Sequence, residues 1–539
     1  MMSAKEEKRI AFNEQMNAWV SRQGLWFQLR HAAEGQSLMA RMTRLGGRLL
    51  LVVALLAVAI WIYLFNRIER DGFREDVRIS LEETFRAESC EVGEIRKERE
   101  LATLAYIKLE GSEEAFYEHL DARGVRTSVS LLDGVYGAWD GKSVLINRLD
   151  IDLKAGGSDD ASAAKSFAAL FVEHDGFTFE RFESPDANLK WGYSIRNQGY
   201  ISNSQLSASR EGDGWRLQFK GGNFGQNWLR PLKIENMVVM CSPRGVIIEE
   251  AQLTAEDGSG RLTFDLAVGS GSQPSLNGKL TIESMPLDTL LSPAFNEWIS
   301  GSISGQGTIS GSTNSQQGVV FDIQFELEDG DQLVVRDSIP ILSALTVVDL
   351  YNSYRRVPFD QGGFHLRSGS DLFHLDQIDL QAGDLLHLAG AVTVRPPSIK
   401  EIAQALNIEN VEQVKNILEK NWKYQDDVLV DTQTGSKLTG ATPQSVEQGS
   451  QAGLSQPQDA VESVLRSAIL NERGVKRYEG AIKLGLKADA FDKAPKLKAA
   501  YPVDAQTNRI WMHTPLEGRL QTLTLSQAER LYLLGRKRQ

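Results

Sequence analysis

The segment from Trp298 to Gly311 reads WISGSISGQGTISG and decides which fold the sequence predicts. Alternate positions, starting at Ile299, are isoleucine or glycine, and the positions between them carry serine, threonine or glutamine. This is the period of a strand with one apolar face, because successive side chains of a pleated backbone point to opposite sides. A dinucleotide-binding loop would need a third glycine where Ser310 stands, so we interpret the segment as a strand.

The same alternation recurs outward from this segment in both directions. The cleanest example is VFDIQFELEDG, which starts at Val320, alternates large apolar residues with polar ones and ends at the turn signal Asp329-Gly330. Comparable segments lie at 144–153, 189–195, 215–219, 262–268, 280–282, 373–375, 386–394, 482–486 and 523–525. The sequence therefore predicts a mainly β protein, built on a long curved antiparallel sheet with a few accessory helices.

A sheet made of such strands has one polar and one apolar face, and something must cover the apolar one. Either a second layer of side chains packs on it as a filled core, or the sheet curls around an apolar trough. The residues predicted to line this interior are Leu262, Phe264, Leu266, Ile299, Ile303, Ile309, Phe321, Ile323, Phe325 and Leu327. The pattern alone leaves both alternatives open.

The segment from Leu49 to Phe65 reads LLLVVALLAVAIWIYLF and carries no charge. Its length reaches the lower limit of the roughly 17–25 residues that a helix needs to cross a bilayer. Residues 57–59 also resemble a signal-peptide cleavage site, but the preceding tail is too long for a signal peptide and the apolar run continues past the site. Residues 48–66 are therefore predicted to be an uncleaved, single transmembrane helix.

Charge leaves the orientation of this anchor open, because basic residues flank both of its ends. A large strand-rich body after a single span is the usual layout of an anchored envelope protein, so we expect residues after 66 to lie outside the cytoplasm. The tail 1–47 would then be cytosolic. Within it, Phe12, Met16 and Trp19 fall at helical spacing beside basic residues. Residues 4–32 are thus predicted to form an amphipathic helix, which either lies on the inner membrane surface or is a plain cytosolic helix or partner-binding tail.

The remaining organisation follows from changes in periodicity and composition. A β-rich region begins at 67–160, the main curved sheet spans 161–395, a helical insertion occupies 396–475, and strands return at 476–539. Helices are predicted at 71–85, 339–351, 398–422 and 461–469. The stretch 431–457 is rich in Gly, Ser, Thr and Gln and is predicted to be a disordered linker.

Composition excludes several classes of function. The chain of 539 residues carries a net charge of -12 without a long basic run, which argues against nucleic acid as a partner. It holds only two cysteines, Cys90 and Cys241, which could form one bridge or remain free thiols. No catalytic motif or cofactor-binding fingerprint is present, so we expect neither an enzyme nor a cofactor.

Three histidines are candidate ligands for a metal ion. His365, His374 and His387 fall in three successive strand segments and could converge as ligands. Each one alternates with apolar neighbours, which is also what an exposed polar face of a sheet requires. We therefore interpret them as exposed sheet residues and predict no metal site.

Several segments resemble the AsmA-like family of bacterial envelope proteins. They are the single N-terminal span, ISGSISGQGTISG, FELEDGDQLVVRDSIPILSAL, FHLRSG and HLDQIDLQAGDLLHLAGAVTV. The resemblance implies kinship with bridge-like lipid transfer proteins, whose sheet folds lengthwise into a trough that is apolar inside. The insertion at 396–475 departs from the simplest layout of that family.

The resemblance also implies a location and a role. The protein would be a single-pass inner-membrane protein with a cytoplasmic N-terminus and a periplasmic domain. It would shield or transfer phospholipid acyl chains and support outer-membrane assembly, with phospholipids, the inner membrane and envelope proteins as partners. The alternative is a membrane-anchored β-rich scaffold with a filled core and no lipid cargo.

Overall fold

The computed structural model divides the chain into two compact units, Met1–Arg70 and Asp71–Gln539, which we describe separately. The structure describes residues 4–24, 27, 38–67, 71–98, 101–113, 115–128, 139–140, 142–153, 177–192, 198–226, 229–269, 275–291, 293–312, 319–369, 372–419, 422–425, 428–431, 437–438, 457–519 and 529–530.

The first unit contains two long helices, α1 (Ala4–Val20) and α3 (Leu38–Arg67). Helix α3 runs through the predicted anchor, and its large apolar side chains between Leu49 and Tyr63 are exposed. Within the described part of the chain, no helix satisfies both the length and the hydropathy required to cross a membrane. The single transmembrane helix at 48–66 stays a prediction. Helix α1 ends at Val20, well before the predicted limit at 32.

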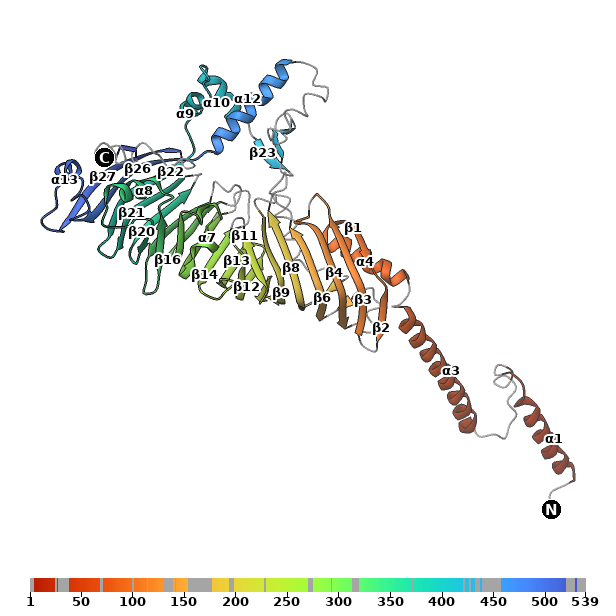
Figure 1. Ribbon diagram of the computed structural model, residues 1–539. Coiled ribbons are helices and arrows are strands. Elements are labelled where there is room, and N and C mark those ends of the chain that lie inside the picture. The colour runs from red at the N-terminus through yellow and green to blue at the C-terminus, as the bar shows by residue number, and fades with distance from the viewer. Residues whose placement is uncertain are drawn as a thin grey trace. The chain divides into compact units, whose positions relative to one another are not determined.

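The second unit is dominated by one sheet of 22 described strands, which lie side by side in Figure 1. In pairing order the strands are β1 (Ala87–Val92) and β2 (Ile95–Glu98), both beside β3 (Leu101–Gly111), then β4 (Tyr117–Ser128), β6 (Ser143–Leu153), β8 (Arg181–Gly192), β9 (Gln198–Glu211), β10 (Gly214–Lys220) and β11 (Asn223–Gln226), β12 (Leu232–Ser242), β13 (Gly245–Thr254), β14 (Arg261–Gly269), β15 (Ser275–Pro286), β16 (Ile299–Ser312), β17 (Val319–Glu326) and β18 (Gln332–Arg336), β19 (Arg356–Phe359) and β20 (Gln361–Gly369), β21 (Leu372–Ala382), β22 (Leu386–Arg395), β26 (Arg477–Lys487) and β27 (Arg509–Arg519). The prediction of a mainly β chain with one large antiparallel sheet is confirmed.

Among the described strands of the large sheet, one pair is parallel rather than antiparallel. Strands β6 and β8 are parallel, with Val144 opposite Phe182 and Leu149 opposite Ala187. A parallel pair needs a crossover of about a dozen residues or more, and the chain between Leu153 and Arg181 is long enough to provide it. Two small sheets accompany the large one: β5 (Trp139–Asp140) pairs with β7 (Phe177–Thr178), and β23 (Trp422–Gln425) and β25 (Lys437–Leu438) flank β24 (Val428–Asp431).

Short helices pack at defined places along the large sheet. Helix α4 (Asp71–Phe85) has the predicted bounds and buries Phe73, Val77 and Leu81. Helix α8 (Pro340–Val348) starts with Pro340 in its first turn, as predicted, and buries Leu345. The remaining short elements in this group are α7 (Leu287–Leu290), the 3-10 turn η2 (Pro293–Phe295) and α13 (Pro495–Ala500).

The helical insertion contains α9 (Ile399–Ala405), α10 (Val411–Glu419) and α12 (Pro457–Gly474). These three helices stand together in Figure 1 and share a small core that includes Ile402, Val414 and Ile469. The prediction of a single helix at 398–422 is wrong. The segment forms two helices, α9 and α10, and Trp422 belongs to β23. The predicted linker 431–457 lies outside the described residues, apart from positions 431, 437–438 and 457.

The break after α9 has a local cause. Asn407 adopts a left-handed backbone with φ of 54°, and the Ile408 amide donates to the Ala403 carbonyl. This is a Schellman ending, which satisfies carbonyls that the helix leaves unpaired. Asn410 then accepts a hydrogen bond from the Glu412 amide at 3.1 Å and so caps α10.

Candidate functional site: the apolar face of the sheet

Strand register aligns apolar side chains into continuous rows on one face of the sheet. From β14 to β22 one row of opposed residues is Leu266, Gly278, Ile309, Phe321, Ser368, Phe373 and Val394. The next row is Phe264, Leu280, Gly307, Ile323, Leu366, Leu375 and Val392. A third begins with Leu262, Ile282, Gly305, Phe325 and Phe364. We call these three rows the apolar face.

The row between the first two points the other way and is polar. Its opposed residues are Asp265, Lys279, Thr308, Asp322, Arg367, His374 and Thr393. Cross-strand polar pairs of this kind suit an exposed face, because they keep charged groups in water. The sheet thus separates its two chemistries over seven consecutive strands.

Aromatic contacts show how the sheet bends between β8 and β14. The rings of Trp191 on β8 and Phe224 on β11 have centroids 6.0 Å apart, and Phe224 lies 6.4 Å from Phe264 on β14. Two strands separate β11 from β14, which amounts to roughly 14 Å of flat sheet at the usual strand spacing. Ring contacts across that separation indicate a sheet that bends toward the face that carries the rings.

The ten predicted interior residues fall into two groups by exposure. Ile303, Ile323 and Phe325 are buried at 2%, 6% and 7% exposure. Partly exposed are Leu262, Phe264, Leu266, Ile299, Ile309 and Leu327, and Phe321 is 37% exposed. The rows through Ile323 and Phe325 are therefore covered at β17, whereas the row through Phe321 is open to solvent there.

Two glycines on this face allow the strands to approach closely. A Cβ atom at Gly307 would lie 2.2 Å from the Asp322 carbonyl oxygen and 2.6 Å from the Ile323 Cα. A Cβ at Gly278 would lie 2.2 Å from the Asp265 carbonyl oxygen. Both distances are shorter than real Cβ contacts, so Gly278 and, in the quoted segment, Gly307 are required by backbone packing rather than by phosphate binding.

The serine side of the same segment forms a buried polar centre that the sequence analysis missed. Asp331 is 4% exposed and accepts hydrogen bonds from the hydroxyls of Ser302 at 2.8 Å and Ser304 at 2.5 Å. The Ser304 oxygen also accepts from the Ser284 amide at 2.9 Å. These bonds tie β16 to the turn before β18. The signal was present in the DGD sequence at 329–331, where the second acid follows a complete turn.

The histidines lie on the polar face and are held by acids. His365 contacts Asp322 through Nε2 at 2.6 Å and Asp376 through Nδ1 at 2.9 Å, and the hydrogen bond with Asp322 is the main cause that raises its pKa above 6.5. His387 contacts Asp379 at 2.5 Å. Among the described residues, no group of three such side chains is placed to hold a metal ion.

The two cysteines are both free thiols. Burial raises the pKa of Cys90 and of Cys241 to about 12. Neither thiol is an activated nucleophile, because the reactive form is the thiolate. The bridge left open by the sequence is absent.

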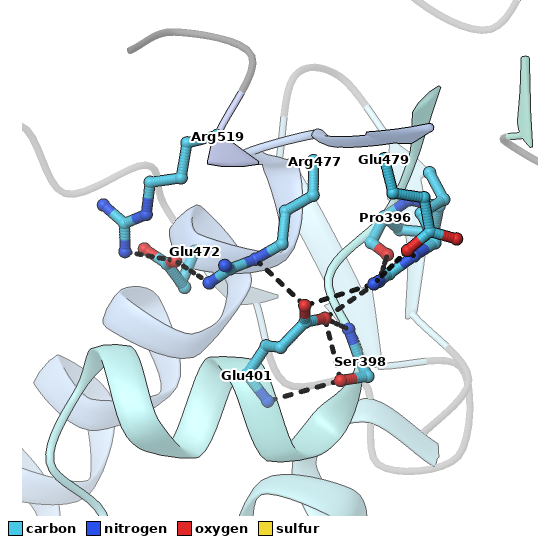
Figure 2. A network of polar contacts seen from close by, with 8 residues as sticks. Pro396, Ser398, Glu401, Glu472, Arg477, Glu479 and Arg519 are labelled. Carbon is cyan, nitrogen blue, oxygen red and sulfur yellow. Dashed lines mark hydrogen bonds and ion pairs between the residues drawn. The ribbon is translucent and has the colours of Figure 1, made fainter. Parts of the chain in front are cut away.

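A cluster of ion pairs holds the helical insertion to the sheet at the two points where it departs and returns (Figure 2). Glu401 on α9 accepts two hydrogen bonds from Arg395 at the end of β22, at 2.8 and 3.2 Å. Glu472 on α12 is 9% exposed and accepts from Arg519 on β27 at 2.6 Å. Arg477, the first residue of β26, lies 3.8 Å from both glutamates. We call this set the clasp.

Comparisons of the chain with protein-family models, with curated proteins and with solved structures find no match in any of the three. The AsmA-like resemblance therefore rests on the quoted segments alone.

Proposed function

We propose that the apolar face holds phospholipid acyl chains and that the protein shields or passes them at the membrane. The observation that carries the proposal is the combination of a mostly apolar register and partial exposure. Leu266, Ile309, Phe321 and Phe373 share one row, in which Gly278 and Ser368 also lie, and the two phenylalanines are 37% and 44% exposed. Exposed aromatic side chains in a continuous row are typical of a surface that is covered when the protein works.

The free energy of transfer favours a face that passes acyl chains between membranes over one that retains them. Each acyl methylene that leaves water for an apolar surface gains about 0.8 kcal/mol. Transfer from a bilayer interior gains almost nothing, because both environments are apolar. A face that bends toward its apolar side would thus accept chains from a membrane and release them to another.

The membrane setting belongs to the same proposal. Helix α3 presents exposed apolar side chains such as Leu50 and Trp61, at 71% and 54% exposure, which favours an anchor in a bilayer. With this anchor the strand-rich unit would work in the periplasm, linked to the inner membrane and supporting outer-membrane assembly. The residues on the apolar face offer burial rather than acid–base chemistry, which supports lipid binding as the role of this face.

The second candidate is an anchored scaffold with a filled core. The burial of Ile303, Ile323 and Phe325 favours it, since protein atoms already cover these side chains. The two candidates differ in what lies against the row through Phe321: acyl chains in the first and no lipid in the second.

Lipid mass spectrometry on the full chain, extracted in a membrane-solubilising polymer without detergent, separates the two. Phe321→Asp places a charge on the exposed row, and Thr308→Asp places one on the polar face of the adjacent strand. We expect wild type and Thr308→Asp to retain equal lipid per protein and Phe321→Asp to retain less. Lipid that surrounds helix α3 is common to all three. Equal retention in all three proteins would favour the scaffold.

A further inference from the structure

The last turn of α8 and the residues that follow it display large apolar side chains in water. Val347, Leu350 and Tyr351 are 38%, 64% and 55% exposed, whereas Leu345 on the same helix is fully buried. The turn is rigidly built: buried Asp349 accepts from the Tyr351 amide at 3.0 Å and from the Tyr354 hydroxyl at 2.6 Å. These hydrogen bonds fix the backbone of the turn that carries Leu350 and Tyr351.

A second segment brings lysines to the same place. The connection between β26 and β27 buries Phe491 and Leu497 at 0% and 2% exposure. Lys493 in this connection places its Nζ 4.8 Å from the centroid of the Tyr351 ring. Figure 1 shows α8 and α13 at the same end of the sheet. We call residues 347–356 together with 489–500 the α8–α13 cap.

The cap is basic in an acidic protein. Its exposed cations are Arg355, Arg356, Lys493, Lys496 and Lys498, and its acids are Asp349, Asp489 and Asp492. Five cations less three acids give +2, against -12 for the whole chain. Asp349 is buried and Asp492 pairs with Lys498, which leaves Asp489 as the acid that could offset the remaining cations.

Exposed apolar side chains that share a surface segment with lysine and arginine fit the interface of an anionic bilayer. The apolar groups enter the boundary between headgroups and acyl chains, and the cations meet lipid phosphates. We propose that the α8–α13 cap docks on an anionic lipid bilayer through Leu350 and Tyr351. This surface lies apart from the rows of the apolar face, so docking does not require that the face hold lipid.

The test uses the full chain with an environment-sensitive fluorophore, NBD, attached at Leu350→Cys. A matched label at Asp213→Cys reports on an exposed turn between β9 and β10. Burial raises the pKa of both native thiols to about 12, which disfavours their labelling at pH 7, and wild-type protein treated in the same way measures any label that they take up. Vesicles consist of phosphatidylcholine alone or mixed with phosphatidylglycerol, and both carry a spin-labelled quencher in the acyl region.

We expect the label at 350 to shift to the blue and to be quenched at least twofold by the anionic vesicles only, with no change at 213. Lys493→Glu with Lys496→Glu should abolish the quenching, whereas Lys142→Glu with Lys220→Glu should preserve it. The first unit can also bind the vesicle. Because the fluorophore is attached at position 350, its blue shift and quenching report whether that position enters the bilayer. A label that remains in water with anionic vesicles would overturn the proposal. Equal quenching in both kinds of vesicle, or quenching that survives reversal of the cap lysines, would overturn it too.

Discussion

A methyl group at Gly307 has no space beside the backbone of β17, since its nearest contact would be 2.2 Å. We predict that Gly307→Ala lowers the thermal unfolding midpoint by forcing β16 and β17 apart, at a cost of about 1–3 kcal/mol. Gly72→Ala in α4 is the matched control, because nothing lies within 4 Å of its added methyl group. Alanine should raise or preserve the midpoint there, since it favours helix by about 0.8–1 kcal/mol over glycine. Equal midpoints for the two variants would contradict the packing described for β16.

Two phenylalanines on the same face of β17 separate folding from function. Phe325 is 7% exposed and its ring lies 5.0 Å from that of Phe364, whereas Phe321 is 37% exposed. Phe325→Asp buries an unpaired charge in addition to losing packing worth about 3–5 kcal/mol, so the protein should unfold or fail to accumulate. Phe321→Asp should keep the wild-type circular dichroism and proteolysis pattern. If Phe321→Asp unfolded as Phe325→Asp does, the row through Phe321 would be core rather than surface.

At the scale of elements, the clasp makes attachment of the insertion dependent on pH. Arg395 lowers the pKa of Glu401 from 4.5 to about 2 chiefly through its hydrogen bonds. A folded-state pKa below the unfolded value stabilises the protein above the unfolded pKa, and this contribution is lost as pH falls through the folded value. The pair therefore stabilises fully above about pH 5 and loses this effect toward pH 2.

The corresponding measurement compares urea unfolding of wild type and Glu401→Gln across this range. The variant should be less stable by on the order of 2 kcal/mol at pH 7, after allowance for solvent screening, and the difference should shrink as pH falls from 4.5 to 2. Glu412→Gln breaks an exposed pair with Lys415 and should change stability far less. If the effect of Glu401→Gln on stability did not vary with pH, the Arg395–Glu401 ion pair would not be the source of the pH dependence.

Elements with their own periodicity could be predicted from the sequence, and those that depend on partners could not. Helix α4 and the Pro340 start of α8 follow from local pattern. The end of α9 depends on the left-handed backbone of Asn407. That conformation lets the Ile408 amide donate to the unpaired Ala403 carbonyl, a tertiary detail that periodicity does not report. The parallel pairing of β6 with β8 depends on which strand the chain returns to. The alternation of apolar and polar residues predicts a strand but does not predict its neighbour in the sheet.

The candidate site was predictable in composition but not in exposure. Alternation placed Phe321, Ile323 and Phe325 on one face, and the observed register agrees. It could not distinguish exposed Phe321 from buried Phe325, because burial depends on what lies above each position. Asp331 was missed for the same reason: only the pairing of β16 with β18 brings Ser302 and Ser304 to it.

At the scale of the whole molecule, the proposed lipid binding depends on what occupies the exposed row of the apolar face. The most direct measurement is photo-crosslinking in cells, with benzoylphenylalanine at position 321 and, as control, at 308 on the opposite face of the neighbouring strand. We predict that phospholipid is attached to the protein labelled at 321 and not to the protein labelled at 308. Crosslinks from 321 to protein alone, or equal lipid capture at the two positions, would contradict the claim that this face carries lipid.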